Sequence, residues 1–219
     1  MEDNKYASLW NSLHKDFKQR NNVCSDDWLK EFDDIIQYDI KGEIIDLGCG
    51  VTGNNTLYLI EKGKKVVSCD FAIEALKEVS KISGSKTLLF DMREKFPFED
   101  DYTDLIIADL SLHYFNDLDT KRIISEIKRV LKPGGYLFLR LNSTNSTEYK
   151  SIIKNKIIQI EPHFVFSNNM EKRFFDEDDI NKYFFDWQFI CKREENMTRW
   201  CPDKIIWKVA LKKKRDLPC

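Results

Sequence analysis

Acidic and glycine residues follow an apolar run in residues 43–55, which read E-I-I-D-L-G-C-G-V-T-G-N-N. Ile44, Ile45 and Leu47 predict a buried strand, and the glycines after it let the backbone turn tightly and approach a ligand where a Cβ would clash. A helix predicted over residues 54–62 directs the free N–H groups of its first turn toward the same ligand. This arrangement is typical of α/β proteins that bind a nucleotide-like cofactor.

Three further acids, Asp70, Asp91 and Asp109, each lie at the end of an apolar run that predicts a strand. The carboxyl ends of parallel strands meet at one edge of an open α/β sheet, where ligands bind. A carboxylate at that edge can accept hydrogen bonds from two ribose hydroxyls, and Asp70 lies 17 residues past Gly53, a spacing that suits this role. The pattern predicts a ribosylated cofactor without naming it, because glycine loops of this kind also bind NAD.

Apolar runs alternate with amphipathic segments, which is the pattern of a parallel sheet with crossover helices. We predict strands over residues 44–47, 65–69, 87–90, 104–110 and 136–141, and helices over 54–62, 72–80 and 119–131. The sequence K-P-G-G at residues 132–135 ends the last of these helices, and we expect Gly134 or Gly135 to form its left-handed C-cap.

Asp46, two residues before the first glycine, adds a family resemblance. With it, the glycine loop resembles the first motif of class I S-adenosylmethionine-dependent methyltransferases, typically D-x-G-x-G-x-G, although the third glycine here falls one residue late. The phrase R-V-L-K-P-G-G-Y-L-F-L also resembles this class, and ordered matches cover residues 43–141. The strings L-S-L-H-Y-F, R-L-N-S and K-R-F-F are similar to those of a small bacterial subgroup near the tellurite-resistance and thiopurine-type enzymes.

The resemblance implies a fold and a cofactor. The fold would be a Rossmann-like, doubly wound, seven-stranded and mostly parallel sheet with a C-terminal antiparallel pair, here residues 188–192 and 205–211. The cofactor would be S-adenosyl-L-methionine, with Asp70 at the ribose, Asp91 at the adenine amino group and Met92 against the ring. The implied cofactor-binding residues are Asp46, Gly48, Cys49, Gly50, Gly53, Asp70, Phe71, Asp91, Met92, Asp109 and Leu110. No metal is implied, and the three histidines lack ligand spacing.

The two ends of the chain are expected to enclose a substrate. Aromatic and apolar residues recur at helical spacing before the first strand and predict two short amphipathic helices that pack on the sheet. The polar segment 142–169 is too long for an ordinary connection, and residues 174–187 predict the last crossover helix. We expect one domain over residues 1–219, with a helical lid (1–40), a cofactor-binding core (43–141), a substrate cover (142–175) and a last helix with the terminal strands (176–211).

Candidate catalytic and substrate-binding residues follow from position. His113 and Tyr114 come just after the fourth predicted strand, where side chains overlook the reacting centre, and His113 is the candidate proton acceptor. Arg140 and Arg173 are expected to hold an anionic group by paired hydrogen bonds, and Trp10 to touch the cofactor or substrate. Salt bridges and core packing are structural alternatives for the same residues. The predicted acceptor is a small, polar or anionic molecule.

Composition excludes several other classes of protein. The 219 residues are 42% hydrophobic, enough for one substantial core, and the net charge of −2 disfavours a dedicated nucleic-acid binder. The six cysteines form no C-x-x-C pair and predict reduced thiols. No N-terminal apolar segment follows Met1 and no apolar run approaches membrane-spanning length, so we expect a cytoplasmic protein without a membrane partner.

Other functions remain open at this point. An NAD(P)-dependent Rossmann-fold oxidoreductase would use the same glycine loop and the same Asp70. The short-chain dehydrogenase spacing Y-x-x-x-K occurs at Tyr58 and Lys62, but it falls in the first helix behind the glycine loop. A methyltransferase acting on RNA or protein, or a pseudoenzyme that binds the cofactor only, is also compatible with the sequence, which leaves the acceptor atom and the oligomeric state undetermined.

Overall fold

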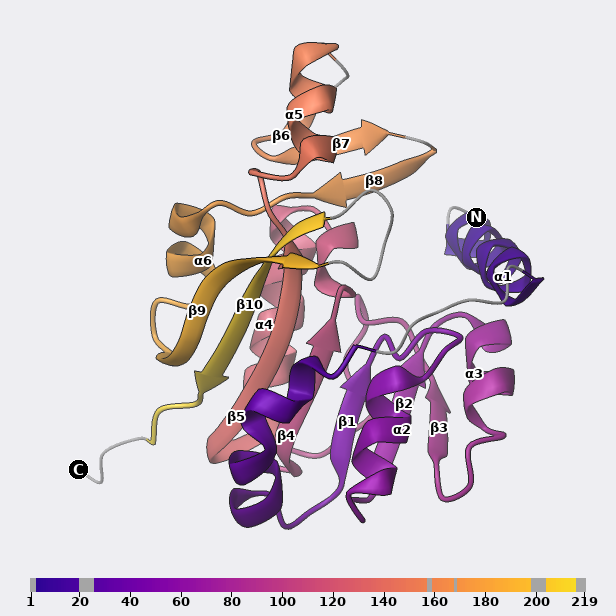
Figure 1. The fold of residues 1–219 in the computed structure, drawn as a ribbon, viewed down its shortest axis with the longest axis vertical. Coiled ribbons are helices and arrows are strands. Elements are labelled where there is room, and N and C mark those ends of the chain that lie inside the picture. The colour runs from indigo at the N-terminus through magenta and orange to yellow at the C-terminus, as the bar shows by residue number, and fades with distance from the viewer. Residues whose placement is uncertain (1–2, 20–25, 157–158, 168, 198–203, 216–219) are drawn as a thin grey trace.

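A seven-stranded sheet forms the centre of the molecule (Figure 1). The computed structural model describes residues 3–19, 26–156, 159–167, 169–197 and 204–215. The strand order is β3-β2-β1-β4-β5-β10-β9, with β10 antiparallel to both of its neighbours and the other pairs parallel. The strands are β1 (Ile44–Leu47), β2 (Val66–Asp70), β3 (Lys86–Leu89), β4 (Thr103–Asp109), β5 (Leu131–Asn142), β9 (Gln188–Met197) and β10 (Lys204–Lys212). The predicted α/β sheet with a C-terminal antiparallel pair is confirmed.

The strand order fixes where a ligand can bind. From β1 the chain moves outward to β2 and β3, and then returns to place β4 on the other side of β1. Open α/β sheets bind ligands in the crevice beyond the carboxyl ends of the strands at such a reversal. The ends of β1 and β4 therefore mark the expected site.

Two apolar layers cover the sheet because strand residues alternate between its faces. On one face, Ile44 packs with η1 (Trp28–Phe32), η2 (Ile35–Asp39) and α2 (Asn54–Glu61). On the other face, Ile45 and Leu47 belong to the cluster that includes α4 (Asp117–Val130) and α6 (Glu177–Tyr183). The resulting sandwich of helices and sheet holds the strand ends in fixed register.

The end of α4 differs from the sequence prediction. The residue after the helix, Leu131, is extended at φ −74° and ψ 134° and starts β5 directly. Gly134 does have a positive φ of 83°, but it lies four residues beyond Val130, in the turn that Lys213 closes by accepting a hydrogen bond from its N–H. The prediction of a left-handed glycine C-cap is therefore wrong.

The polar segment after β5 folds into a compact unit. It contains α5 (Thr147–Lys154) and a three-stranded antiparallel sheet of β6 (Gln159–Glu161), β7 (Phe164–Ser167) and β8 (Met170–Arg173). Ile152, Val165 and Phe174 form its own small core. Figure 1 shows this unit at the top of the molecule, beyond the carboxyl ends of the parallel strands. We call α5 with β6, β7 and β8 the cover.

The N-terminal segment contains one long helix and two short turns. Helix α1 (Asp3–Gln19) lies beside α3 (Ile73–Val79), where the backbone N–H of Glu74 donates to Asn11 Oδ1 at 3.1 Å (Figure 1). The second amphipathic helix expected before β1 is instead the 3₁₀ turn η1 followed by the π-helical turn η2. Their apolar side chains still pack on the sheet as predicted.

Cysteine state and membrane contact were also expected from the sequence. Among the described cysteines, Cys49, Cys69 and Cys191 are free thiols, and Cys24, Cys201 and Cys219 lie outside the described residues. Burial raises the pKa of Cys49 and Cys69 well above its usual value. Within the described ranges, no helix is both long and apolar enough to cross a bilayer.

Candidate active site

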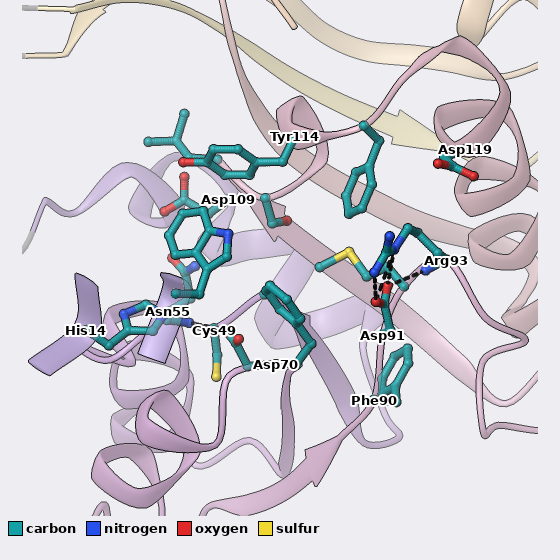
Figure 2. Close-up of a pocket in the computed structure, with 18 of the residues that line it drawn as sticks. His14, Cys49, Asn55, Asp70, Phe90, Asp91, Arg93, Asp109, Tyr114 and Asp119 are labelled. Carbon is teal, nitrogen blue, oxygen red and sulfur yellow. Dashed lines mark hydrogen bonds and ion pairs between the residues drawn. The ribbon is translucent and has the colours of Figure 1, made fainter. Parts of the chain in front are cut away.

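A cavity of about 460 Å³ lies at the carboxyl ends of the parallel strands (Figure 2). Its volume falls in the range of small-molecule and cofactor sites. Eleven predicted site residues line it, namely Trp10, Gly48, Cys49, Gly50, Asp70, Phe71, Asp91, Met92, Asp109, Leu110 and Tyr114. Five others, Asp46, Gly53, His113, Arg140 and Arg173, do not line it.

The glycine loop uses its glycines in different ways. Gly48 has a φ of +77°, and a Cβ there would lie 2.4 Å from Ser111 Cβ, so the segments that follow β1 and β4 can approach this closely only with a glycine at position 48. Gly50 has a φ of +61°, and a Cβ there would meet no atom within 4 Å. Gly53 is the left-handed N-cap of α2 and packs against Val79. The one-residue displacement of this third glycine thus turns it away from the cavity toward α3.

Asp70 holds the glycine loop in place. Its two carboxylate oxygens accept hydrogen bonds from the backbone N–H groups of Gly50 at 3.0 Å and Ala72 at 2.9 Å. A carboxylate offers about four acceptor positions, so the oxygens retain capacity toward the cavity. Burial raises the pKa of Asp70, and burial also lowers the pKa of the neighbouring His14. The strand-end acid is thus a preorganised acceptor.

Asp46 acts inside the fold and not in the cavity. It is completely buried, and its carboxylate accepts hydrogen bonds from Thr56 Oγ1 at 2.7 Å and Asn55 Nδ2 at 3.4 Å. Asn55 in turn accepts from the indole N–H of Trp28 at 2.9 Å. The acid of the first motif therefore ties β1 to α2 and η1. Asp46 is indirect support for the cavity wall and not a ligand contact.

Burial raises the pKa of Asp46 to about 7, far above its unfolded value near 4. The folded protein then binds more protons than the unfolded chain between pH 4 and 7, so this residue lowers the free energy of unfolding as pH rises through that window. Asp46→Asn cannot titrate. The variant should therefore lack this loss of stability. Relative to the wild type, its free energy of unfolding should rise by about 2–4 kcal/mol between pH 4 and pH 7.

Urea unfolding of both proteins at intervals of half a pH unit measures this difference. Acids with lowered pKa values, such as Glu31 and Asp117 at about 2, change stability below this window and are common to both proteins. A difference that is independent of pH would show that Asp46 titrates normally in the fold.

Arg93 changes the environment of Asp91. Its Nε donates to Asp91 Oδ1 at 3.1 Å and its Nη2 to Asp91 Oδ2 at 2.6 Å, and its backbone N–H donates to Asp91 Oδ1 at 2.9 Å (Figure 2). A bidentate guanidinium–carboxylate pair fixes the orientation of both groups. Arg93 was not predicted from the sequence, although an arginine two residues after a strand-end acid, in the same turn, was a usable signal.

Arg140 is buried in an ion-pair cluster. Its Nε and Nη2 each lie 2.7 Å from an Asp109 oxygen, and Nη1 lies 2.7 Å from Asp26 Oδ2. The guanidinium also stacks over the Trp28 ring at 4.7 Å. The expectation that Arg140 anchors a substrate is therefore corrected. Its donors orient Asp109, whose neighbour Leu110 has a strained positive φ of 54° at the cavity wall.

Arg173 and His113 are also directed into the fold. Arg173 donates to Glu161 Oε2 at 2.6 Å and to the backbone carbonyl of Phe115 at 3.1 Å, so it joins the cover to the segment after β4. His113 is 2% exposed, its Nδ1 has no hydrogen-bond partner, and burial lowers its pKa well below the usual value. The roles of substrate anchor and accessible proton acceptor are corrected for these two residues.

Two aromatic residues meet across the top of the cavity. The ring centroids of Trp10 and Tyr114 are 4.8 Å apart in an edge-on arrangement, and His14 lies one helical turn beyond Trp10. Burial raises the pKa of Tyr114 above its usual value. Figure 2 shows Tyr114 above the cavity, with His14 and Asp91 on opposite sides of it. The contact places α1 against the segment after β4.

Several lining residues were not found from the sequence. They are His14, Thr52, Asn54, Asn55, Phe90, Arg93, Ser111, Phe115, Asn116, Asp119 and Glu171. His14 shares a helix face with Trp10, which was a usable signal. Glu171 belongs to β8 in the cover, where short polar strands give little periodicity, and the sequence offered no signal for it.

His163 lies in a cluster with two aspartates outside the cavity. His163 Nδ1 lies 2.6 Å from Asp179 Oδ2, and Asp176 and Asp179 form the capping box of α6. The possible ligand atoms of the three residues lie within 4.8 Å of one another, a proximity that histidine spacing alone did not indicate. Helix capping accounts for this cluster.

The fold is that of an α/β protein with a cavity at the carboxyl ends of its parallel strands, and the comparisons indicate its class. Residues 45–139 match a family model described as a methyltransferase domain. The malonyl-[acyl-carrier protein] O-methyltransferase of Hamiltonella defensa is 27% identical over 167 residues, which cover 76% of this chain and 58% of that protein. Residues 45–139 are therefore similar to a methyltransferase domain, and this similarity implies S-adenosylmethionine as the cofactor.

Solved structures show the same fold. A Methanosarcina mazei S-adenosylmethionine-dependent methyltransferase aligns with a TM-score of 0.74 at 21% identity, covering 85% of this chain and 98% of that one. TehB from Haemophilus influenzae aligns with a TM-score of 0.65 at 20% identity, covering 90% and 65%. The chain spans about half the length of the curated relatives it matches, between 40% and 58% for three of them.

Proposed function

We propose that the protein transfers the methyl group of S-adenosylmethionine to a small-molecule acceptor held between the strand ends, α1 and the cover. One observation carries this proposal. The same cavity is lined by Gly50, Asp70 and Asp91 from the strand ends, by Trp10 from α1 and by Glu171 from the cover. A cofactor and an acceptor held on these surfaces would share one enclosed space.

The cofactor-binding residues have distinct proposed roles. Asp70 accepts hydrogen bonds from the ribose hydroxyls with the oxygen lone pairs that Gly50 and Ala72 leave free. Asp91, oriented by Arg93, accepts from the adenine amino group, and Met92 packs against the ring. Gly48, Cys49 and Gly50, together with Phe71, Asp109 and Leu110, supply backbone surface for the rest of the cofactor.

Methyl transfer from a sulfonium is an in-line displacement, so the protein mainly needs to orient the acceptor and exclude water. Trp10 and Tyr114 both line the cavity, and the edge-on contact between their rings covers part of it. Tyr114 is the candidate residue beside the reacting centre. His113 contributes packing against Tyr114, with the ring centroids 4.2 Å apart.

Two relatives act on small molecules by name, a phosphoethanolamine N-methyltransferase of Triticum aestivum and a demethylmenaquinone methyltransferase of Streptomyces avermitilis. They support a small acceptor for this chain. The test is incubation of the full chain with labelled S-adenosylmethionine and, separately, a metabolite library, bulk tRNA and histone peptides. We expect label in the metabolite fraction. Robust labelling of tRNA or peptides without any labelled metabolite would contradict the proposal.

The proposed lid gives a further prediction. Deleting residues 1–20 removes the Trp10 contact with Tyr114 but leaves Gly50, Asp70 and Asp91 in place. We expect turnover of an acceptor from the library to fall at least about tenfold, while affinity for S-adenosylhomocysteine falls less than about threefold. Calorimetry and initial rates measure the two effects.

Trp10→Ala is the milder variant for the same question, because α1 and its Asn11 contact with α3 remain. It should lower turnover in the same direction. Equal losses of cofactor affinity and turnover in both variants would assign α1 to the cofactor site and remove its role as a lid.

A further inference from the structure

Two carboxylates in the cavity have no partner among the residues that the structure describes. Glu171 of β8 and Asp119 in the first turn of α4 both line the cavity, and neither makes a hydrogen bond or ion pair through its carboxylate within the described part of the chain. The other three cavity acids are engaged. Asp70 accepts two backbone N–H groups, Asp91 binds Arg93 and Asp109 binds Arg140.

Among the described residues that line the cavity, the guanidinium is already paired with a carboxylate. Arg93 is the guanidinium among the described lining residues, and it forms a bidentate pair with Asp91. Arg140 and Arg173 point into the fold, as described above. Burial lowers the pKa of His14, which favours its neutral form. Among the described lining residues, an anionic acceptor would therefore meet the carboxylates of Glu171 and Asp119 but no unpaired guanidinium.

The surroundings of the two carboxylates favour a cation. Asp119 lies in the first turn of the 14-residue helix α4, where the helix dipole keeps its carboxylate ionised but also offsets part of its attraction for a cation. Aromatic rings from Trp10, Tyr114 and Phe115 line the same cavity, and such rings attract an organic cation through their faces. Figure 2 shows Asp119 on the side of Arg93, across the cavity from His14.

We propose that the acceptor carries an organic cation, such as a substituted ammonium group, which Glu171 and Asp119 bind beside the aromatic rings. This inference rests on the proposed methyltransferase function and specifies its substrate class. It replaces the anionic acceptor expected from Arg140 and Arg173. The cation is the group that the protein recognises, and the methylated atom can lie elsewhere on the same molecule.

The test uses three probes that share a phenethyl group and differ in charge: phenethylamine, 2-phenylethanol and 3-phenylpropanoate. Calorimetry first establishes that the full chain binds S-adenosylhomocysteine. Each probe is then titrated into the saturated protein at pH 7. We expect phenethylamine, which is protonated at this pH, to bind at least about tenfold more tightly than the alcohol or the carboxylate.

Charge-neutral variants test the assignment to residues. Glu171→Gln and Asp119→Asn should each reduce the preference for phenethylamine over 2-phenylethanol, and the double variant should abolish it. Glu99→Gln is the matched control, because Glu99 is exposed on the loop before β4 and does not line the cavity. It should keep the full preference.

The outcomes separate the two proposals. Failure to bind S-adenosylhomocysteine would contradict the proposed function itself. Normal binding of S-adenosylhomocysteine with no binding of phenethylamine, with equal or tighter binding of 3-phenylpropanoate, or with an unchanged preference in the double variant would overturn the cationic acceptor alone.

Discussion

Asp70→Ala is expected to weaken binding of S-adenosylhomocysteine by roughly 1.5–3 kcal/mol, about 10- to 150-fold, because hydrogen bonds to a charged group are worth this much. The variant loses the acceptor for the ribose and also the bonds that hold Gly50 and Ala72. Calorimetric titration of the folded variant measures the loss.

Asp104→Ala is the matched control for this variant. Asp104 also accepts a backbone N–H, from Gly42 at 2.9 Å, but it lies at the start of β4 and not at the cavity end. Its loss should lower stability without changing cofactor affinity. An Asp70→Ala protein that is folded and binds with wild-type affinity would remove Asp70 from the cofactor site.

Arg140→Ala is expected to lower the free energy of unfolding by about 3–5 kcal/mol, the cost of leaving a buried ion pair without one partner. Asp109 keeps its position beside the strained Leu110 only while the guanidinium balances its charge. Urea unfolding with and without S-adenosylhomocysteine measures the change. We also expect weaker cofactor binding, because Asp109 lines the cavity.

Arg193→Ala provides a comparison at the surface. Arg193 pairs with Glu31 at 2.5 Å, but its side chain is 44% exposed, and exposed pairs of this kind contribute less than about 1 kcal/mol. If Arg140→Ala were as stable as the wild type and raised only the KM of the acceptor, Arg140 would be a substrate anchor after all.

The sequence predicted the central sheet because its strands and helices have strong apolar periodicity and clear glycine or acid ends. The boundaries of β1, β2, β3 and β4 differ from the predicted ones by a residue or so. The region before β1 was harder to predict, since 3₁₀ and π-helical turns place apolar residues on one face nearly as an α-helix does. The apolar spacing in residues 28–39 correctly predicted helical turns that pack on the sheet, but it did not predict their 3₁₀ and π-helical type.

The sequence predicted the site residues whose place at a strand end brings them to the cavity. It did not predict the orientation of residues whose side chains pair with distant parts of the chain. Asp109 and Arg140 are direct partners in the register of β4 and β5, so a register model of the sheet would have paired them. Arg173 and Glu171 depend on the fold of the cover, whose polar sequence has no strong period. A positive charge near a strand end therefore did not show that Arg93 lines the cavity or that Arg140 and Arg173 point into the fold.

Binding of S-adenosylhomocysteine and NADH to the full chain, compared by calorimetry, tests the central claim most directly. The cavity at the ends of β1, β2, β3 and β4 should bind S-adenosylhomocysteine at one site per chain, with affinity that falls in Asp70→Ala and persists in Asp104→Ala. NADH should not compete. Saturable binding of NADH together with no binding of S-adenosylhomocysteine would contradict the assignment of this cavity to methyl transfer.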